Sequence, residues 1–585
     1  MEPRVKRRWK EMEADPDDIN RLSCDCAIPP LLARLLLNRG VGSSAEVPLF
    51  LAPSLSALPD PFLMLGMERG AERLARAVIN GERVSVYGDY DVDGITAVAL
   101  LISFFRAVGL DSFYYIPNRL EEGYGLGEEG VRRVASMKAA VIVTVDCGIT
   151  SIAEAELCSS LGIDLIITDH HTPGDILPAA HAVLNPLQPG CPFPGKTLAG
   201  VGVAFNLLIA LRSKLRENGH FTGRAEPNLR GYLDLVALGT IADIVPLVDE
   251  NRIYVTYGLR ELTNSARGGV QQLKKVAAVT GTVDCGMVGF RLGPRLNAAG
   301  RLEDATLGVE LLLGSDPEKG ALIAAELDAS NKERQEIEQL ILRDVIARLK
   351  EGEPLRNRKS IVLASEGWHP GVIGIVASRV VDLYHRPTIL IALQDGIGRG
   401  SGRSIPGFHL LDALKACSGE LLKFGGHRYA AGLSLEETAL EAFAAQFEAV
   451  ADQLLTPEEL LPQLRIDAFL SPGEIDLEMT EMLGSLEPYG MGNPTPVFAV
   501  RGARIVERRL LKERHLKLKL EMGGQYHEAI GFNMADIGTF DGVVDLAFSL
   551  DINSWNGKKN VQLKLRDIRE ATDLHSSDPS GGRRR

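Results

Sequence analysis

The chain has 585 residues, of which 45% are hydrophobic and 24% charged, and its formal net charge at pH 7 is −13. This length exceeds what one hydrophobic core can organise, so we expect about three to four domains of ordinary globular composition. The acidic balance argues against a general nucleic-acid coat protein but leaves room for an enzyme with one local basic groove.

Targeting and redox features point to the cytoplasm. We expect no transmembrane helix, because no apolar run reaches about 18 residues. The charged segment 1–18 lacks an apolar core, so it is not expected to be a secretion signal. Seven cysteines without a CxxC pair fit a reducing cytoplasm better than a disulfide framework or a zinc ribbon.

The first third of the chain changes from helical to alternating character. Residues 1–80 indicate a helical extension. From Val84 to about residue 250, short β-branched runs alternate with helical stretches, which predicts a parallel α/β sheet. The expected strands lie within 83–88, 139–148 and 163–171, with helices over 95–109 and 151–162.

A long helix, capped by Asp316 and opened by Pro317, is expected to connect this region to a second α/β unit over 359–450. Beyond about residue 460, strict alternation and an Asn556-Gly557 hairpin signal predict a small barrel or sandwich. We therefore divide the chain into a helical extension, a first α/β domain, a connector helix, a second α/β domain, a β-barrel and a disordered tail: 1–80, 81–310, 311–352, 353–455, 456–572 and 573–585.

Acidic residues follow each of the three predicted strands. Asp89, Asp91 and Asp93 alternate after the first strand, Asp146 follows the second, and Asp169–His171 follow the third. Ligands of open parallel sheets bind at the carboxyl ends of strands, so these side chains are expected at one edge. Such crowding becomes favourable once divalent cations neutralise it.

Carboxylates and imidazole are the ligands that Mn²⁺ and Mg²⁺ prefer, and two such ions about 3.5–4 Å apart would activate water against a phosphoester. Each motif taken alone has a simpler interpretation. Asp89–Asp93 would be an acidic loop, Asp146 and Asp243 helix caps, and His170–His171 surface residues. Because the four motifs occur together and in this order, the simpler interpretations would require four independent coincidences.

These motifs resemble the DHH phosphoesterase superfamily and, within it, the bacterial single-strand-specific exonucleases. The resemblance covers nearly the whole chain and rests on VYGDYDVDGITAVALL, VTVDCGIT, ITDHH, LAGVGVAFNL, LVALGTIADIVPL, RLGPRLNAAGRL, GWHPGVIGIVASR, FGGHRYAAG and EPYGMGNPTPVF. It implies a parallel-sheet DHH domain joined by a long helix to a second α/β, DHH-associated domain, followed by an OB-like β-barrel. It also implies a 5′→3′ exonuclease that uses two Mn²⁺ or Mg²⁺ ions, degrades single-stranded DNA to 5′-mononucleotides and serves DNA recombination and repair.

The resemblance carries metal-binding roles to Asp89, Asp91, Asp93, Asp146, His170 and Asp243. Asp146 is expected to bridge both ions, and Asp243 to complete the shell of the ion that His170 binds. Asp169 and His171 would orient these ligands or face the substrate. The expected catalytic residues are Asp91, Asp93, Asp146, His170 and His171. Tyr87 stands where many members have a histidine, which implies a first ion more dependent on Asp89 or water.

Arginines separated by glycines suit phosphate contacts, because guanidinium binds phosphate bidentately and bare backbone amides approach closely. The expected nucleic-acid-binding residues are Arg119, Arg295, Asn297, Arg301, Arg379, Arg399, Ser401, Arg403 and His427. Without the resemblance, Arg399 and Arg403 would flank a flexible Gly-rich turn, and His427 would be a core or turn histidine. Trp368 and Trp555 are expected to be packing residues.

Two rivals to the exonuclease remain. A DHH phosphodiesterase of short oligonucleotides or cyclic dinucleotides would not need the N-terminal extension or the barrel. A non-catalytic single-strand-binding scaffold would have decayed metal ligands, whereas all are present here. For the exonuclease, the expected partners are single-stranded DNA, a single-strand-binding protein and a helicase, and the chain is expected to act as a monomer without a membrane.

Overall fold

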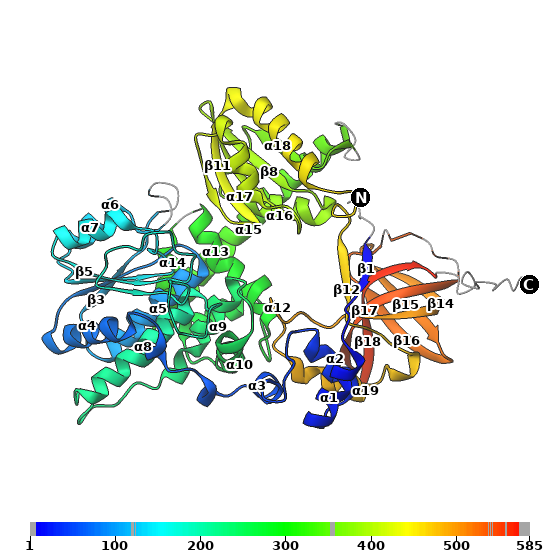
Figure 1. Cartoon of the computed structure of the whole chain (residues 1–585), viewed down its shortest axis with the longest axis horizontal. Helices are drawn as coiled ribbons and strands as arrows, with labels where there is room; N and C mark the ends of the chain where they lie inside the picture. Colours follow the sequence, from blue (N-terminus) through cyan, green and yellow to red (C-terminus); the bar gives the residue numbers. More distant parts are fainter. Residues whose placement is uncertain are drawn as a thin grey trace, which may run out of the picture. The chain divides into compact units, whose positions relative to one another are not determined.

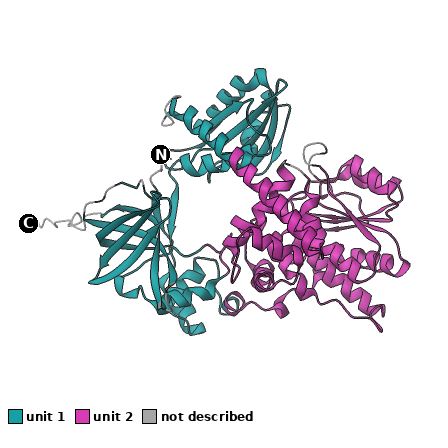
Figure 2. Ribbon diagram, turned by 180° about the vertical axis from the view of Figure 1, so that it is seen from behind, with its two compact units in different colours: residues 1–47, 338–487, 495–585 teal, residues 48–337, 488–494 magenta. Residues whose placement is uncertain are grey.

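The computed structural model contains two compact units (Figure 2). Unit 1 comprises Met1–Val47, Glu338–Glu487 and Thr495–Arg585, and unit 2 comprises Pro48–Ile337 and Pro488–Pro494. The structure describes residues 7–118, 122, 125–302, 304–351, 357–535, 537–538, 540, 542–555 and 558–571. The predicted disordered tail, 573–585, lies outside these residues.

Unit 2 is built on a five-stranded parallel sheet, of which Figure 1 labels β3 and β5. The strand order is β3-β2-β4-β5-β6. Its strands are β2 (Val84–Tyr87), β3 (Ser112–Tyr115), β4 (Val141–Val145), β5 (Asp164–Thr168) and β6 (Ala182–Leu184). The central strands are buried because both faces are covered by helices, as their β-branched composition predicts. The predicted parallel α/β sheet is confirmed.

Alternate strand residues face two different helical layers. Val86 and Val143 belong to a core shared with α4, α5 and α8, whereas Tyr87 and Ile142 belong to a core shared with α6 and α7. These helices are α4 (Met67–Asn80), α5 (Val92–Ala107), α6 (Glu128–Ser136), α7 (Ile152–Ser160) and α8 (Gly200–Glu217). The sheet is therefore held rigidly between two apolar layers.

A helical lobe follows the sheet and leads into the connector. Its helices are α9 (Leu233–Ala242), α10 (Asp249–Thr263), α11 (Gly268–Val276), α12 (Cys285–Met287), the π-helix η4 (Val288–Leu292), α13 (Gly293–Leu302) and α14 (Thr306–Leu313). The connector is α15 (Pro317–Glu351), and the amide of Glu318 donates to Asp316 Oδ1 at 2.9 Å. The predicted cap at Asp316 is thus confirmed.

The second α/β domain contains a sheet in the order β10-β11-β9-β8-β7. Its elements are β7 (Ile361–Ser365), α16 (Ile373–Tyr384), β8 (Thr388–Gln394), β9 (Ile397–Arg403), α17 (Leu410–Ala416), β10 (Lys423–Gly426), β11 (Ala430–Glu436) and α18 (Leu440–Leu454). The Gly-rich segment ending at Arg403 is therefore a central strand, and the interpretation as a turn was wrong. Glycine suits it because a Cβ at Gly400 would lie 2.7 Å from Leu433 Cδ1.

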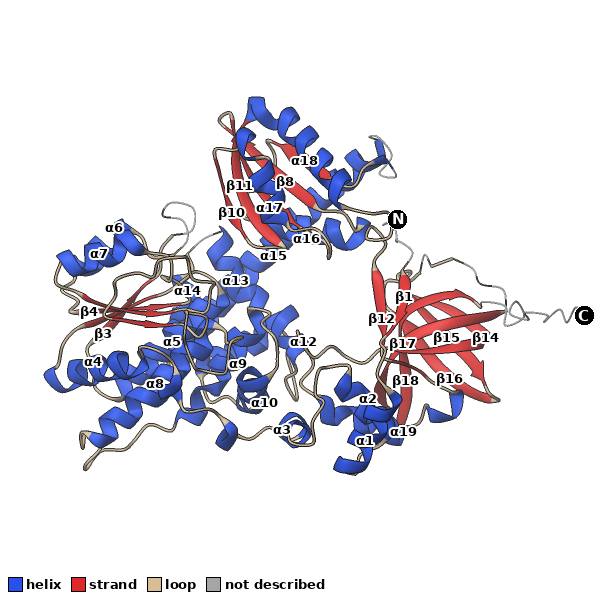
Figure 3. Cartoon of the chain, viewed as in Figure 1, coloured by secondary structure: helices blue, strands red, loops and turns tan. Residues whose placement is uncertain are grey.

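The C-terminal domain is a closed barrel, because β14 pairs with both β15 and β17 (Figure 3). Its strands are β13 (Ala468–Phe469), β14 (Phe498–Leu511), β15 (His515–Met522), β16 (Gln525–Gly531), β17 (Val543–Trp555) and β18 (Lys558–Glu570), with α19 (Leu477–Leu483) beside them. The prediction of a small barrel is confirmed. Trp555 pairs with Lys558, as an Asn-Gly hairpin requires, although the turn residues lie outside the described part.

The N-terminal region departs from a purely helical extension. It contains α1 (Pro16–Cys26), α2 (Pro30–Leu37) and α3 (Glu46–Leu51), but its first element is a strand, β1 (Arg8–Glu11), which pairs with β12 (Gln463–Ile466). Residues 1–47 group with unit 1, whereas 48–80 group with unit 2. Among the described residues, no helix is both long and apolar enough to span a membrane.

The packing of β9 predicts that Gly400→Val destabilises the second α/β domain by about 1–3 kcal/mol, because the added branches collide with Leu433 and Ile391. Hydrogen exchange of the β8, β9 and β11 amides measures the effect. Gly432→Ala is the matched control, since its Cβ would meet only Gly400 O, at 3.9 Å. Equal protection in both variants would contradict this account.

Candidate metal centre

The ends of three adjacent strands supply the acidic residues of the site. Asp89 and Asp91 follow β2, Asp146 follows β4, and Asp169 begins the segment after β5. Asp91 is also the N-cap of α5, where its side chain accepts from the Gly94 amide at 3.0 Å. The parallel order of β2, β4 and β5 therefore delivers the predicted residues to one edge of the sheet.

Two glycines let the backbone and the carboxylates approach closely. A Cβ at Gly94 would lie 2.6 Å from the carbonyl oxygen of Asp89, and one at Gly200 would lie 2.8 Å from Asp146 Oδ1. Neither position can therefore carry a larger residue without displacing a candidate ligand. Gly200 was not among the predicted site residues, although LAGVGVAFNL, which contains it, belongs to the motif series.

Asp93 is held by the beginning of α8. The amides of Gly200 and Val201 donate to its two carboxylate oxygens at 2.6 and 2.8 Å. Burial, followed by the charge of Asp91, raises the pKa of Asp93 to about 7, although the two amides act in the opposite direction. The helix N-terminus thus orients this carboxylate and partly offsets its buried charge.

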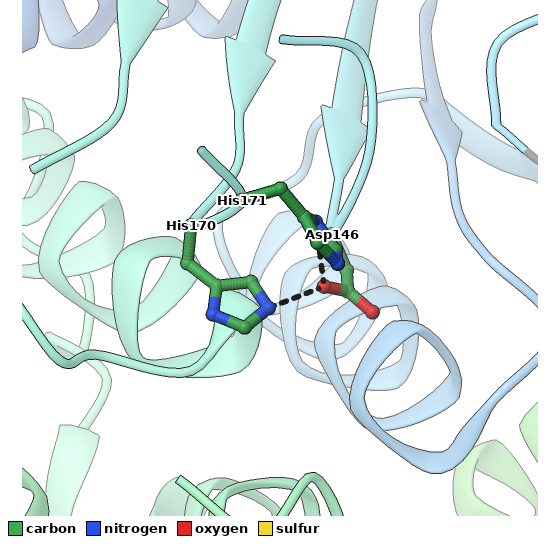
Figure 4. A group of neighbouring side chains, drawn as sticks. All are labelled: Asp146, His170 and His171. Carbon is green, nitrogen blue, oxygen red and sulfur yellow. Dashed lines mark ion pairs between the residues drawn. The ribbon is translucent and has the colours of Figure 1, made fainter. Parts of the chain in front are cut away.

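Asp146 lies beside His170 and His171 (Figure 4). Its backbone is left-handed, with φ 61°, a conformation that aspartate adopts more readily than most residues. His170 Nε2 lies 3.1 Å from Asp146 Oδ1, and His171 Nδ1 lies 3.9 Å from the same oxygen. Burial, reinforced by the neighbouring aspartates, raises the pKa of Asp146 well above its usual value.

Asp243 completes the other side of the site. It ends α9, and its Oδ2 lies 3.6 Å from His170 Nε2. Both of these atoms are buried and make no hydrogen bond within the described part of the chain. Burial, followed by the charges of Asp93 and Asp91, raises the pKa of Asp243 to about 9. A purely capping role does not account for a buried carboxylate oxygen without a donor.

The candidate ligand atoms form three overlapping sets, and within each set they lie within 4.8 Å of one another. The sets are Asp89/Asp91/Asp146, Asp146/His170/His171 and Asp93/His170/Asp243. They contain all six predicted metal-binding residues and share Asp146 and His170. Hard carboxylate oxygens, alone in the first set and with one or two imidazoles in the others, fit Mn²⁺ or Mg²⁺, and a cation would relieve the repulsion that raises the aspartate pKa values.

Asp169 orients the two histidines. It is buried and accepts from the amides of Ile149, His170 and His171, and its Oδ1 lies 2.7 Å from His171 Nδ1. Burial alone would raise its pKa, but these hydrogen bonds outweigh burial and hold the pKa below its usual value. Burial lowers the pKa of His170 to about 4, so this ring is neutral and able to coordinate.

Tyr87 packs into the core instead of joining the metal site. Its hydroxyl accepts from the Gly127 amide at 3.4 Å, and its ring lies 5.2 Å from the Tyr115 ring. Asp89, by contrast, belongs to a candidate ligand set. The expectation that the first ion depends more on Asp89 or water stays a prediction.

The predicted nucleic-acid-binding residues of unit 2 differ in their surroundings. Arg295 pairs with Asp328 at 2.8 Å, and Asn297 Oδ1 accepts from the Val92 amide at 3.1 Å. Asn297 therefore holds the start of α5 beside Asp91 and Asp93. Arg301 is partly exposed on α13. Arg119 lies outside the described residues.

The predicted nucleic-acid-binding residues of unit 1 lie on β9, on α16 and in the turn between β10 and β11. Arg399, Ser401 and Arg403 alternate along the strand, and the Arg403 guanidinium donates to Ser401 Oγ at 3.2 Å. Arg379 pairs with buried Glu338, and His427 is exposed in the turn between β10 and β11.

Of the two tryptophans predicted to be packing residues, Trp368 is buried and donates to Asp344 at 2.9 Å, which confirms a packing role. The side chain of Trp555 lies outside the described part of the structure.

Comparisons with known proteins match three regions and the chain as a whole. Residues 83–240 match the DHH family N-terminal domain, 357–453 the DHHA1 domain and 466–567 the RecJ OB domain. The chain is 41% identical to the single-stranded-DNA-specific exonuclease RecJ of Escherichia coli K12, over 97% of this chain and 100% of that protein. It is 37% identical to RecJ of Bacillus subtilis 168, over 96% of this chain and 71% of that protein.

A crystal structure of RecJ from Thermus thermophilus in complex with Mn²⁺ is similar in fold. The TM-score is 0.83 at 34% identity, over 97% of this chain and 80% of that chain. The fold class expected from the sequence is therefore confirmed in solved structures as well as in this one.

The raised aspartate pKa values predict that the affinity for Mn²⁺ increases with pH. Below their folded pKa values of about 7 and about 9, Asp93 and Asp243 hold protons that the cation must displace. Affinity should rise between about pH 6 and pH 8, by about tenfold per pH unit for each proton released. Calorimetry in buffers of different ionisation enthalpy counts the protons.

Stability of the metal-free protein should change in the opposite sense. An aspartate whose pKa in the folded protein is raised above its usual 3.8 stabilises the fold fully below pH 3.8. This stabilisation is lost as the pH rises through the pKa of the folded protein.

Asp243→Asn should release fewer protons on Mn²⁺ binding than the unaltered protein. An affinity independent of pH over this range would contradict the assignment.

Proposed function

This chain belongs to the family of RecJ exonucleases, and on that premise we propose that it hydrolyses single-stranded DNA from its 5′ end and releases 5′-mononucleotides. The observation that carries the proposal is the overlap of three candidate ligand sets at Asp146 and His170. Overlapping carboxylate sets suit two cations that share a bridging ligand. In a non-catalytic scaffold, this uncompensated buried charge would lower the stability of the fold without contributing to an activity.

Two ions of Mn²⁺ or Mg²⁺ would supply the activated nucleophile and the charge stabilisation for phosphodiester hydrolysis. Asp89, Asp91, Asp93, Asp146, His170 and Asp243 would hold them. The amides at the start of α8 keep Asp93 oriented, and Asp169 keeps the segment after β5 oriented. These contacts preorganise the site before substrate binds.

His171 is the candidate for contact with the scissile phosphate. Its side chain is 35% exposed, compared with 13% for His170, so it is the histidine more accessible to substrate. Burial alone would lower its pKa, but the hydrogen bond and charge of Asp169 outweigh burial and raise the pKa. A partly protonated imidazole at this position would attract a phosphate oxygen.

We assign recognition of the 5′-phosphate to Arg119 and to the β9 residues Ser401 and Arg403, because polarity requires a feature that exists only at the strand end. A terminal phosphate carries more charge and more free oxygens than an internal diester, so guanidinium groups distinguish the two. Alternation along β9 supports the assignment. Gly400 faces the core with Leu433, so its neighbours Arg399, Ser401 and Arg403 project from the other face.

The proposal extends to the biological setting. The seven cysteines, all of which lie in the described part of the chain, form no disulfide bond, which supports a reducing cytoplasm. Degradation of single strands during DNA recombination and repair would bring the enzyme together with a helicase that exposes them and a protein that coats them. We propose that it acts there as a monomer.

Asp146→Asn should abolish nucleotide release, because the substitution removes the shared ligand while preserving side-chain shape and tolerance of φ 61°. Release of labelled mononucleotide from 5′- and 3′-labelled single strands with Mn²⁺ measures the loss and the polarity together. The metal-free variant should be no less stable than the unaltered protein, since a buried charge is removed. Near-normal turnover at saturating Mn²⁺ would exclude the two-ion assignment.

Arg403→Ala should weaken use of 5′-phosphorylated strands by about 1.5–3 kcal/mol, because a charged contact to the terminal phosphate is lost. Strands with a 5′-hydroxyl should be poorer substrates from the start and lose less. Initial rates for both proteins on both strands form a double cycle that isolates the coupling. Lys415→Ala, an exposed charge on α17, is the control. Strictly additive effects would place end recognition elsewhere.

A further inference from the structure

Residues 488–494, here called the 488–494 loop, belong to a different unit from the chain on either side of them. Pro488–Pro494 group with unit 2, whereas Glu487 and Thr495 group with unit 1. The loop meets unit 2 shortly after the candidate ligand Asp243. The amide of Leu247 donates to the carbonyl of Met491 at 2.7 Å. The loop therefore packs against the chain segment that follows the candidate ligand Asp243.

Two glycines allow this loop to lie flat against the chain that follows Asp243. A Cβ at Gly490 would lie 2.6 Å from Leu247 Cδ1, and one at Gly492 would lie 3.1 Å from Pro246 Cβ. Leu247 is 2% exposed and belongs to the main core of unit 2, so it has little room to move away. Gly492 also has a φ of 75°, which favours glycine.

The loop keeps its shape through its own contacts and through one buried arginine. Gly490 and Asn493 exchange backbone hydrogen bonds, and the Asn493 side chain donates to the Pro488 carbonyl at 2.9 Å. Arg252, which is 2% exposed, donates to the Pro488 carbonyl at 3.5 Å and to the Phe50 carbonyl at 2.8 Å. The docked conformation is thus specified at several points.

The chain between Asp243 and Leu247 needs such support because it contains a strained residue. Ile244 has φ 62°, a conformation that β-branched residues rarely adopt, and its side chain is 69% exposed. Strain of this kind persists only where the surroundings overdetermine the backbone. Asn251 holds the Pro246 carbonyl at 3.0 Å from one side, and the 488–494 loop holds Leu247 from the other.

We infer that the 488–494 loop is a positioning element for Asp243, so that binding of the cation held by Asp93, His170 and Asp243 depends on its docking. The inference rests on the proposed function. Because the loop contacts Leu247, which follows Asp243 in the chain, it acts through the backbone between them. Loss of docking relaxes Ile244, and the Asp243 carboxylate leaves the vicinity of His170.

The test uses the full-length, metal-free protein with Gly490→Ala and Gly490→Val, which place one or three carbons against Leu247. Mn²⁺ titrations followed by electron paramagnetic resonance report the affinity of each site without reference to activity. We expect one of two sites to weaken by about tenfold or more, as for other groups that orient metal ligands, while the other is unchanged. Activity should return at saturating Mn²⁺.

A second-site change provides the rescue. Leu247→Ala removes the Cδ1 and Cγ atoms that a Cβ at Gly490 would meet, at 2.6 and 3.1 Å. The Gly490→Ala/Leu247→Ala protein should bind Mn²⁺ within about twofold of Leu247→Ala alone, since second-site coupling is expected only between atoms in contact. Met491→Ala, whose exposed side chain is not used, and Gly484→Ala, which meets no atom within 4 Å, are the controls.

Each outcome decides the matter. Unchanged Mn²⁺ affinities in folded Gly490→Ala and Gly490→Val would overturn the inference, as would equal weakening of both sites with lowered stability of the metal-free protein. If Gly490→Val does not fold, Gly490→Ala and its rescue decide. Failure of the unaltered protein to bind two Mn²⁺ ions would instead refute the proposed function.

Discussion

Repulsion among buried carboxylates is the constraint on which unit 2 depends. Five aspartates from three chain segments meet at one edge of the sheet, and burial and mutual repulsion raise the pKa values of Asp93, Asp146 and Asp243. An arrangement of this kind is unfavourable in itself and becomes favourable only with positive charge or donors. The backbone supplies part of the compensation at Asp93, through the first amides of α8. Divalent cations would supply the rest.

The same constraint explains why small residues surround the site. Ligands must approach within a few ångströms without losing their orientation, so the second layer is made largely of backbone. Gly94 leaves room for the Asp89 carbonyl, and Gly200 leaves room for the Asp146 carboxylate. Asn297 holds the start of α5, because its Oδ1 accepts from the Val92 amide. The 488–494 loop follows the same pattern, since its glycines bring one backbone against another. Close packing of this kind transmits small displacements directly to the ligands.

Glycine has a different structural role in the second α/β domain. Strand β9 must be central in a sheet whose one face is crowded with large apolar side chains, so every second position lacks a side chain. The alternate positions are then free to carry Arg399, Ser401 and Arg403 on the opposite face. A composition that suggests a flexible turn is thus compatible with a rigid strand, because neighbouring strands supply the order that glycine lacks.

Local sequence patterns were enough to predict the parallel sheet, the barrel strands and the candidate ligands. Their signals are local: hydrophobic periodicity marks each strand, and parallel topology places the residues that follow at one edge, so Asp91, Asp146 and His170 could be expected together. Contacts between residues far apart in the chain could not be predicted in this way and are seen in the tertiary structure alone. Examples are the pairing of β1 with β12, the ion pair of Arg295 with Asp328, and the docking of the 488–494 loop at Leu247. Such contacts leave no periodic trace in either segment, because each partner is specified by surroundings that exist only after folding.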